Sequence, residues 1–138
     1  MYATQQNMID RFGEDELLAV ADRDDDAAID TDLVAAALSD AASVIDSYIA
    51  TRYDLPLADT PAQLTKIACD IARYNLYTDA PHERVTEAYK AAIGLLRDIA
   101  TGKARLDIAG DEPTADQAGS AEIQSAERLF SANSLKGF

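Results

Sequence analysis

The sequence has few of the side chains that most catalytic and metal sites require. Its 138 residues contain one histidine, one cysteine and no tryptophan. A zinc site needs several His or Cys ligands at defined spacing, and a nucleophile such as Ser needs a neighbouring base. His82 stands alone, and no glycine-rich phosphate loop is present. We therefore expect no catalytic residue, no metal ligand set and no cofactor, which means that the chain is not an enzyme.

Two further absences concern the compartment in which the chain is made. Cys69 is the only cysteine, so no disulfide can form within the chain, and its apolar helical surroundings predict a small core residue. No stretch approaches the ~20 apolar residues that a membrane span needs, and no basic segment precedes an apolar run at the N-terminus. The sequence therefore predicts a protein of the reducing cytoplasm that enters no membrane.

Basic residues are scarce relative to acidic ones. Lys and Arg number 12 against 25 Asp and Glu, and the formal net charge is -13. Because Lys and Arg supply most of the binding energy on phosphate backbones, tight direct DNA binding is disfavoured. The acids concentrate in residues 10–32 and again in 107–138, whereas residues 52–105 are nearly balanced. An uneven distribution of charge of this kind suits a subunit that meets neighbouring proteins in one orientation, as in a stack.

The chain also has only 6 glycines and 4 prolines, and it is rich in alanine, so helix is favoured throughout. The three-four spacing of apolar residues, with capping residues at the ends, predicts short helices over 4–12 and 14–21 and longer ones over 30–53, 60–79 and 83–101. Beyond a short extended piece near 106–108, no strand alternation appears. We predict an all-α fold, a compact bundle of about four to five helices.

The last thirty residues have a different composition. After Ile108 the sequence GDEPTADQAGSAE lacks large apolar side chains, and the ending then regains several of them. A polar linker of this kind cannot order itself by burial, and its apolar end is typical of a docking peptide. We therefore divide the chain into a helical domain, residues 1–106, and a flexible linker with a C-terminal arm, residues 107–138, which we expect to become ordered on assembly.

Two patterns suggest binding sites but have simpler interpretations. Acids from Asp22 to Asp30 fall at several ligand positions of a calcium-binding loop, yet Ala27 replaces the glycine and Leu33 replaces the bidentate glutamate. We interpret this run as a solvated acidic loop, and cation binding there stays open. Five tyrosines could stack on bases, but at helical spacing in an acidic protein they are core or interface residues: Tyr48, Tyr53, Tyr74, Tyr77 and Tyr89.

Three segments carry a family resemblance. IDSYIATRYDLPL at 45–57, IACDIARYNLY at 67–77 and the ending ERLFSANSLKGF at 127–138 resemble the Mu-like bacteriophage head-to-tail connector family. The shared features are the step Arg52-Tyr53, the corner Leu55-Pro56-Leu57, the step Ala72-Arg73-Tyr74 and an aromatic-serine step in the tail. The resemblance spans nearly the whole chain.

Membership in that family implies a structural virion protein, a head-completion adaptor at the head-tail junction. The resemblance implies a homo-oligomeric ring, a dodecamer, that contacts the phage portal protein and a tail-side connector or terminator protein. DNA would pass through the lumen without specific binding. We expect the partner-binding residues to be Arg52, Tyr53, Arg128, Leu129, Phe130, Leu135 and Phe138.

An alternative of another class uses the same acidity. Carboxylates can imitate phosphates, so the chain could be an acidic host-interaction protein or a DNA mimic that occupies a nucleic-acid-binding protein. Salt-sensitive binding to a basic host protein would distinguish this alternative. A small helical enzyme is the weakest interpretation, because it would need a pocket of convergent titratable groups that the sequence gives no reason to expect.

Overall fold

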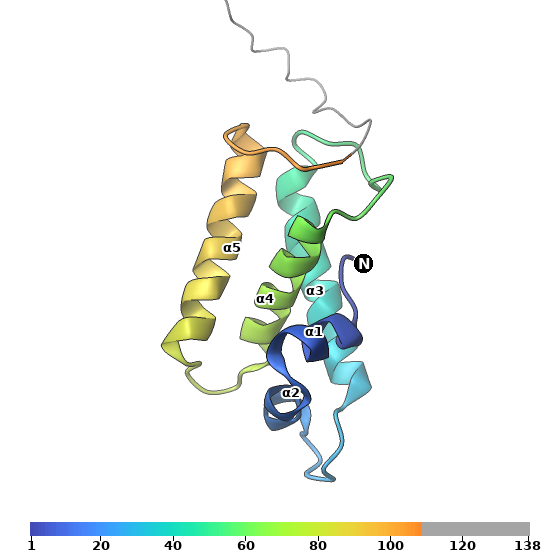
Figure 1. The fold of residues 1–138 in the computed structure, drawn as a ribbon, viewed down its shortest axis with the longest axis vertical. Coiled ribbons are helices and arrows are strands. Elements are labelled where there is room, and N and C mark those ends of the chain that lie inside the picture. The colour runs from blue at the N-terminus through green and yellow to red at the C-terminus, as the bar shows by residue number, and fades with distance from the viewer. Residues whose placement is uncertain (109–138) are drawn as a thin grey trace, which may run out of the picture.

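A computed structural model of the chain describes residues 1–108, which form a bundle of helices (Figure 1). The described part contains helices and no strand, which confirms the all-α prediction. The helices in chain order are α1 (Gln5–Phe12), α2 (Glu14–Ala21), α3 (Thr31–Ile49), α4 (Ala62–Leu76) and α5 (Glu83–Thr101). Figure 1 shows α3, α4 and α5 running along the long axis, with α1 and α2 across the lower half of the molecule.

Helix α4 lies at the centre of the core and packs against α1, α3 and α5. Small side chains at Ala68, Cys69 and Ala72 allow neighbouring helices to approach it closely, and all three are fully buried. The apolar surface of α4 is therefore covered on more than one side. The buried residues of α4 are Leu64, Ile67, Ala68, Cys69, Asp70, Ile71, Ala72 and Leu76.

The sequence located most helix ends correctly. Thr4 caps α1 in a capping box with Asn7, and the side chain of Asp30 accepts a hydrogen bond from the backbone N–H of Leu33 at 3.1 Å to begin α3. Gly102 ends α5 in the left-handed conformation at φ 86°, a conformation that glycine adopts without steric cost. Cys69 is buried as expected, and its burial raises the pKa of the thiol to about 11.

Two predicted helices are shorter than the sequence indicated. The helix expected over 30–53 ends at Ile49, and turns follow it up to Tyr53. The helix expected over 60–79 begins after Pro61, whose ψ of 148° is extended, so this proline occupies the cap position rather than the first turn. It ends at Leu76, where Tyr77 turns to an extended conformation and the Leu76 carbonyl accepts a hydrogen bond from Arg23 at 3.4 Å.

The segment after α5 is not a strand, yet it belongs to the packed domain. Leu106 and Ile108 are buried against the core, on either side of the exposed Asp107. Figure 1 shows this segment crossing from the end of α5 toward the loop that joins α3 to α4. The core therefore includes Ile108, a residue that the sequence-based division at 106 placed in the linker. None of the described helices is long and apolar enough to cross a membrane.

Candidate interaction surfaces

Arg52 and Tyr53, the two expected partner-binding residues within the described chain, hold the end of α3 against the end of α5. Tyr53 is buried, and its hydroxyl accepts a hydrogen bond from the backbone N–H of Leu106 at 3.1 Å. The guanidinium of Arg52 covers Gly102 so closely that a Cβ built there would lie 2.7 Å from Nη1. A cation at the C-terminal end of a helix also complements the helix dipole. Tyr53 thus acts inside the domain, and Arg52 is half-buried beside it.

These contacts fix the point at which the chain leaves the domain. Leu106 is hydrogen-bonded to Tyr53 and Ile108 is buried, so the described chain ends beside the loop that joins α3 to α4 (Figure 1). The other five expected partner-binding residues lie outside the described residues: Arg128, Leu129, Phe130, Leu135 and Phe138.

At the opposite end of the bundle, an ion pair joins α2 to α4. Arg73 donates two hydrogen bonds to the Glu16 carboxylate, from Nε at 2.5 Å and from an Nη at 2.8 Å, and its guanidinium stacks over the Phe12 ring at 4.3 Å. The Tyr77 hydroxyl donates a third hydrogen bond to Glu16 at 3.2 Å. Burial, followed by the negative charge of Glu16, raises the pKa of Tyr77. Three donors therefore hold this carboxylate in one position.

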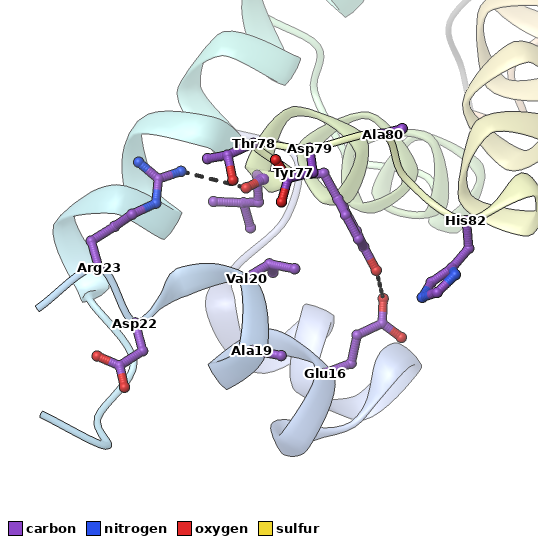
Figure 2. A pocket seen from close by; sticks show the side chains of 11 residues that line it. Glu16, Ala19, Val20, Asp22, Arg23, Tyr77, Thr78, Asp79, Ala80 and His82 are labelled. Carbon is purple, nitrogen blue, oxygen red and sulfur yellow. Dashed lines mark hydrogen bonds between the residues drawn. The ribbon is translucent and has the colours of Figure 1, made fainter. Parts of the chain in front are cut away.

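Two residues of this cluster, Glu16 and Tyr77, line a cleft of about 530 Å³ between α2 and the corner that joins α4 to α5 (Figure 2). Figure 2 shows the Tyr77 ring reaching toward Glu16, with His82 beside it. His82 is exposed at the start of α5 and meets the Tyr77 ring edge-on, with ring centroids 6.2 Å apart. The lining contains no Ser, Cys or Lys. Its carboxylates come from Glu16, Asp22 and Asp79, and its aromatic rings come from Tyr77 and His82.

The acidic loop that follows α2 folds back on itself. The carboxylate oxygens of Asp22 accept hydrogen bonds from the backbone N–H groups of Asp26 and Ala27, both at 3.0 Å. Ala27 has a positive φ of 63°, the conformation for which a calcium loop uses glycine. Asp22, the first ligand position of such a loop, thus turns to the backbone instead. Within residues 1–108, no group of three or more His, Cys, Asp or Glu side chains could hold a metal ion.

The tyrosines pack within the domain. Tyr53 is buried, and the rings of Tyr74 and Tyr89 stack between α4 and α5 with centroids 4.0 Å apart. The expectation of core or interface positions is therefore confirmed for these three residues. A stacked pair of this kind adds roughly 0.5–1.5 kcal/mol beyond its buried area.

A second hollow, of about 480 Å³, lies between the N-terminus and the corner at Leu55. Its position follows from two contacts: the Tyr2 hydroxyl donates to the Asp46 carboxylate, and the Thr65 hydroxyl donates to the Tyr2 carbonyl at 2.9 Å. Tyr2 has a raised pKa because it is partly buried and because it donates to Asp46. The corner Leu55-Pro56-Leu57 falls between the helices predicted over 30–53 and 60–79, but nothing in the sequence spacing indicated that Met1 and Tyr2 would pack beside it.

Comparison with known proteins gives one family. Residues 2–125 match the model of the family described as Bacteriophage Mu, Gp36. The Mu-like prophage FluMu protein gp36 of Haemophilus influenzae is 33% identical over 138 residues, which is 100% of this chain and 98% of that relative. Gene product J of Escherichia phage Mu is 30% identical over 103 residues, 74% of this chain and 73% of that protein. The family match includes every described helix.

We predict that Tyr53→Phe lowers the free energy of unfolding by about 1–3 kcal/mol, because the buried N–H of Leu106 loses its acceptor. Chemical denaturation measures this change, and hydrogen exchange at the Leu106 amide should become faster. Tyr48→Phe is the matched control, since Tyr48 is only half-buried. Equal stability and equal Leu106 exchange in the wild type and Tyr53→Phe would contradict the anchoring role.

We also predict strong coupling between Glu16 and Arg73. A double-mutant cycle with Glu16→Gln and Arg73→Met should give an interaction energy of about 1–3 kcal/mol, because the pair is bidentate and its side chains are only 27% and 14% exposed. Lys66 and Asp70 form the control pair, whose coupling should be smaller because Lys66 is 64% exposed. A Glu16–Arg73 coupling no larger than that of the control would show that the pair does not fasten α2.

Proposed function

The chain belongs to the bacteriophage Mu Gp36 family, and from that membership we propose that it is a structural virion protein that connects the phage head to the tail. The observation that carries the proposal is the family match across residues 2–125, together with a prophage relative similar along almost its whole length. Membership in this family supports a structural or assembly role in a phage. The proposal goes further and assigns the chain to an adaptor ring beneath the portal.

The distribution of charge and apolar surface is compatible with a ring. One end of the bundle carries the acidic loop and the cleft lined by Glu16, Asp22 and Asp79. The other end carries Arg52, the anchored segment 103–108 and the hollow beside Leu55. A closed ring is built from heterologous contacts, in which two different surfaces of the subunit meet. Ends of unlike chemistry can also set which side faces the portal. We propose twelve copies in this ring.

In this proposal the C-terminal arm makes the contact with the neighbouring phage proteins. Its apolar and basic residues, Arg128, Leu129, Phe130, Leu135 and Phe138, dock on the portal or on the tail-side connector or terminator protein. Arg52 adds a contact near the exit of the arm, and Tyr53 acts indirectly by anchoring Leu106. Ordering a peptide on a preformed groove is a common mode of recognition.

The proposal also covers the passage of DNA, the chemistry of the chain and its location. A net charge of -13 makes the lumen of the ring repel the phosphate backbone, so DNA passes through without being held. The chain needs no cofactor and catalyses no reaction in this role. It is made in the host cytoplasm and is carried in the virion at the head-tail junction.

The direct test mixes the purified chain with the portal protein from the same genome and images the product by electron microscopy. We predict a ring stacked on the portal, and we predict that the full-length variant with Phe130→Ser and Phe138→Ser loses it, as does a chain that ends at Glu122. Ala91→Ser, at an exposed position of α5, is the control and should assemble normally. No association with the portal, together with salt-sensitive binding to a basic host protein, would instead favour the acidic host-interaction or DNA-mimic alternative.

A further inference from the structure

The hollow beside Leu55 has a mixed lining, in which exposed apolar side chains stand next to polar groups of Tyr2, Asp46 and Thr60. Among residues 1–108, Met1 and Leu55 are the large hydrophobic side chains that stand exposed, at 70% and 36%, and both line this one hollow. Pro56 and Leu57 extend the apolar wall. Elsewhere in the described part the large apolar side chains are at least partly covered, so an exposed pair at one place indicates a binding surface.

The hollow is held in shape by its own polar contacts. Asp46 accepts a hydrogen bond from the Tyr2 hydroxyl, and Thr65 donates to the Tyr2 carbonyl, so α3 and α4 together fix the N-terminal residues opposite the corner. A preformed surface loses little entropy when it is occupied. At about 480 Å³, the hollow takes a few side chains of a short segment.

The chain itself supplies a segment of matching chemistry. Residues 127–138 place the basic Arg128 next to Leu129 and Phe130, and the basic Lys136 next to Leu135. Apolar side chains from such a segment match the wall of Met1 and Leu55. Its basic neighbours match the Asp46 carboxylate at the edge of the hollow and the acidic domain as a whole.

The point where the described chain ends makes this segment available at high local concentration. Leu106 is bonded to Tyr53, only two residues from Leu55, and Figure 1 shows the described chain ending beside that loop. Residues 109–126 connect Ile108 to the segment, and this number of residues reaches about 60 Å at full extension. A connection that can span the distance between two sites gives an effective concentration on the order of a millimolar. Binding within one chain therefore prevails over binding between copies at micromolar concentrations.

We propose that the hollow lined by Met1, Leu55 and Leu57 holds residues 127–138 of the same chain before assembly. The segment that docks on other phage proteins is then covered in the free subunit, and a partner with a larger complementary surface displaces it. Because the apolar side chains of residues 127–138 are covered in this arrangement, free subunits would aggregate and associate with one another more slowly. It concerns the free chain and does not depend on which phage protein finally receives the arm.

Paramagnetic relaxation tests the proposal on the full chain. A nitroxide is attached at Ser134→Cys, and the native Cys69 stays unlabelled because it is fully buried and its thiol has a raised pKa. We expect selective loss of NMR peak intensity at Met1, Leu55 and Leu57, with no loss at Val85 at the other end of the bundle. Leu55→Arg should remove this effect, whereas Ala91→Arg, which adds the same charge at an exposed position of α5, should preserve it.

A second variant leaves the helical domain unchanged. Full-length Phe130→Ser with Leu135→Ser should also abolish the intensity loss, so the test does not depend on whether Leu55→Arg folds. A mixed sample of isotope-labelled wild type and spin-labelled but isotope-free Ser134→Cys detects exchange between copies. Intensity loss in that mixture would show that a second copy occupies the hollow and would overturn the proposal. The proposal would also be overturned if the chain that carries both the isotope and the nitroxide showed no loss of peak intensity, or the same loss at every residue.

Discussion

The burial of α4 is the constraint on which the rest of the domain depends. A fifteen-residue helix with eight buried positions must be covered on several sides, and α1, α3 and α5 provide that cover. Three of its side chains then make the contacts that position the N-terminal residues, α2 and α5. Thr65 holds the N-terminal residues through the Tyr2 carbonyl, Arg73 holds α2 through Glu16, and Tyr74 stacks on Tyr89 of α5. Both candidate surfaces are therefore positioned from the same helix.

This arrangement gives the two ends of the subunit different chemistry. The end with Glu16, Tyr77 and the acidic loop is polar and negatively charged, with its carboxylate held by three donors. The end with Tyr53 carries the exposed side chains Met1 and Leu55 and the hydrogen bond that holds Leu106. Two ends of unlike chemistry are what the proposed oriented ring requires.

The sequence predicted the helical class and most helix ends, because capping residues and apolar spacing are local signals. The helices predicted to begin at residues 4 and 30 and to end at residue 101 are capped in the structure by Thr4, Asp30 and Gly102. The ends at Ile49 and Leu76 were predicted too late, because they are set by turns and by a contact from Arg23 that lies far away in the sequence. Glu16 and Arg73 are 57 residues apart, and Tyr2 and Asp46 are 44 apart, so their pairing depends on tertiary packing alone. Tyr53 is buried inside the domain and bonded to Leu106, a contact that spacing in the sequence could not reveal, and its expected contact with a partner stays a prediction.

The most direct test of the central claim is to locate the protein in purified virions by immunogold electron microscopy. If it is a connector, gold should label the vertex where the tail joins the head, and it should do so in mature particles. Absence of the protein from virions, although it is abundant in the infected cell, would contradict a structural role at the head-tail junction.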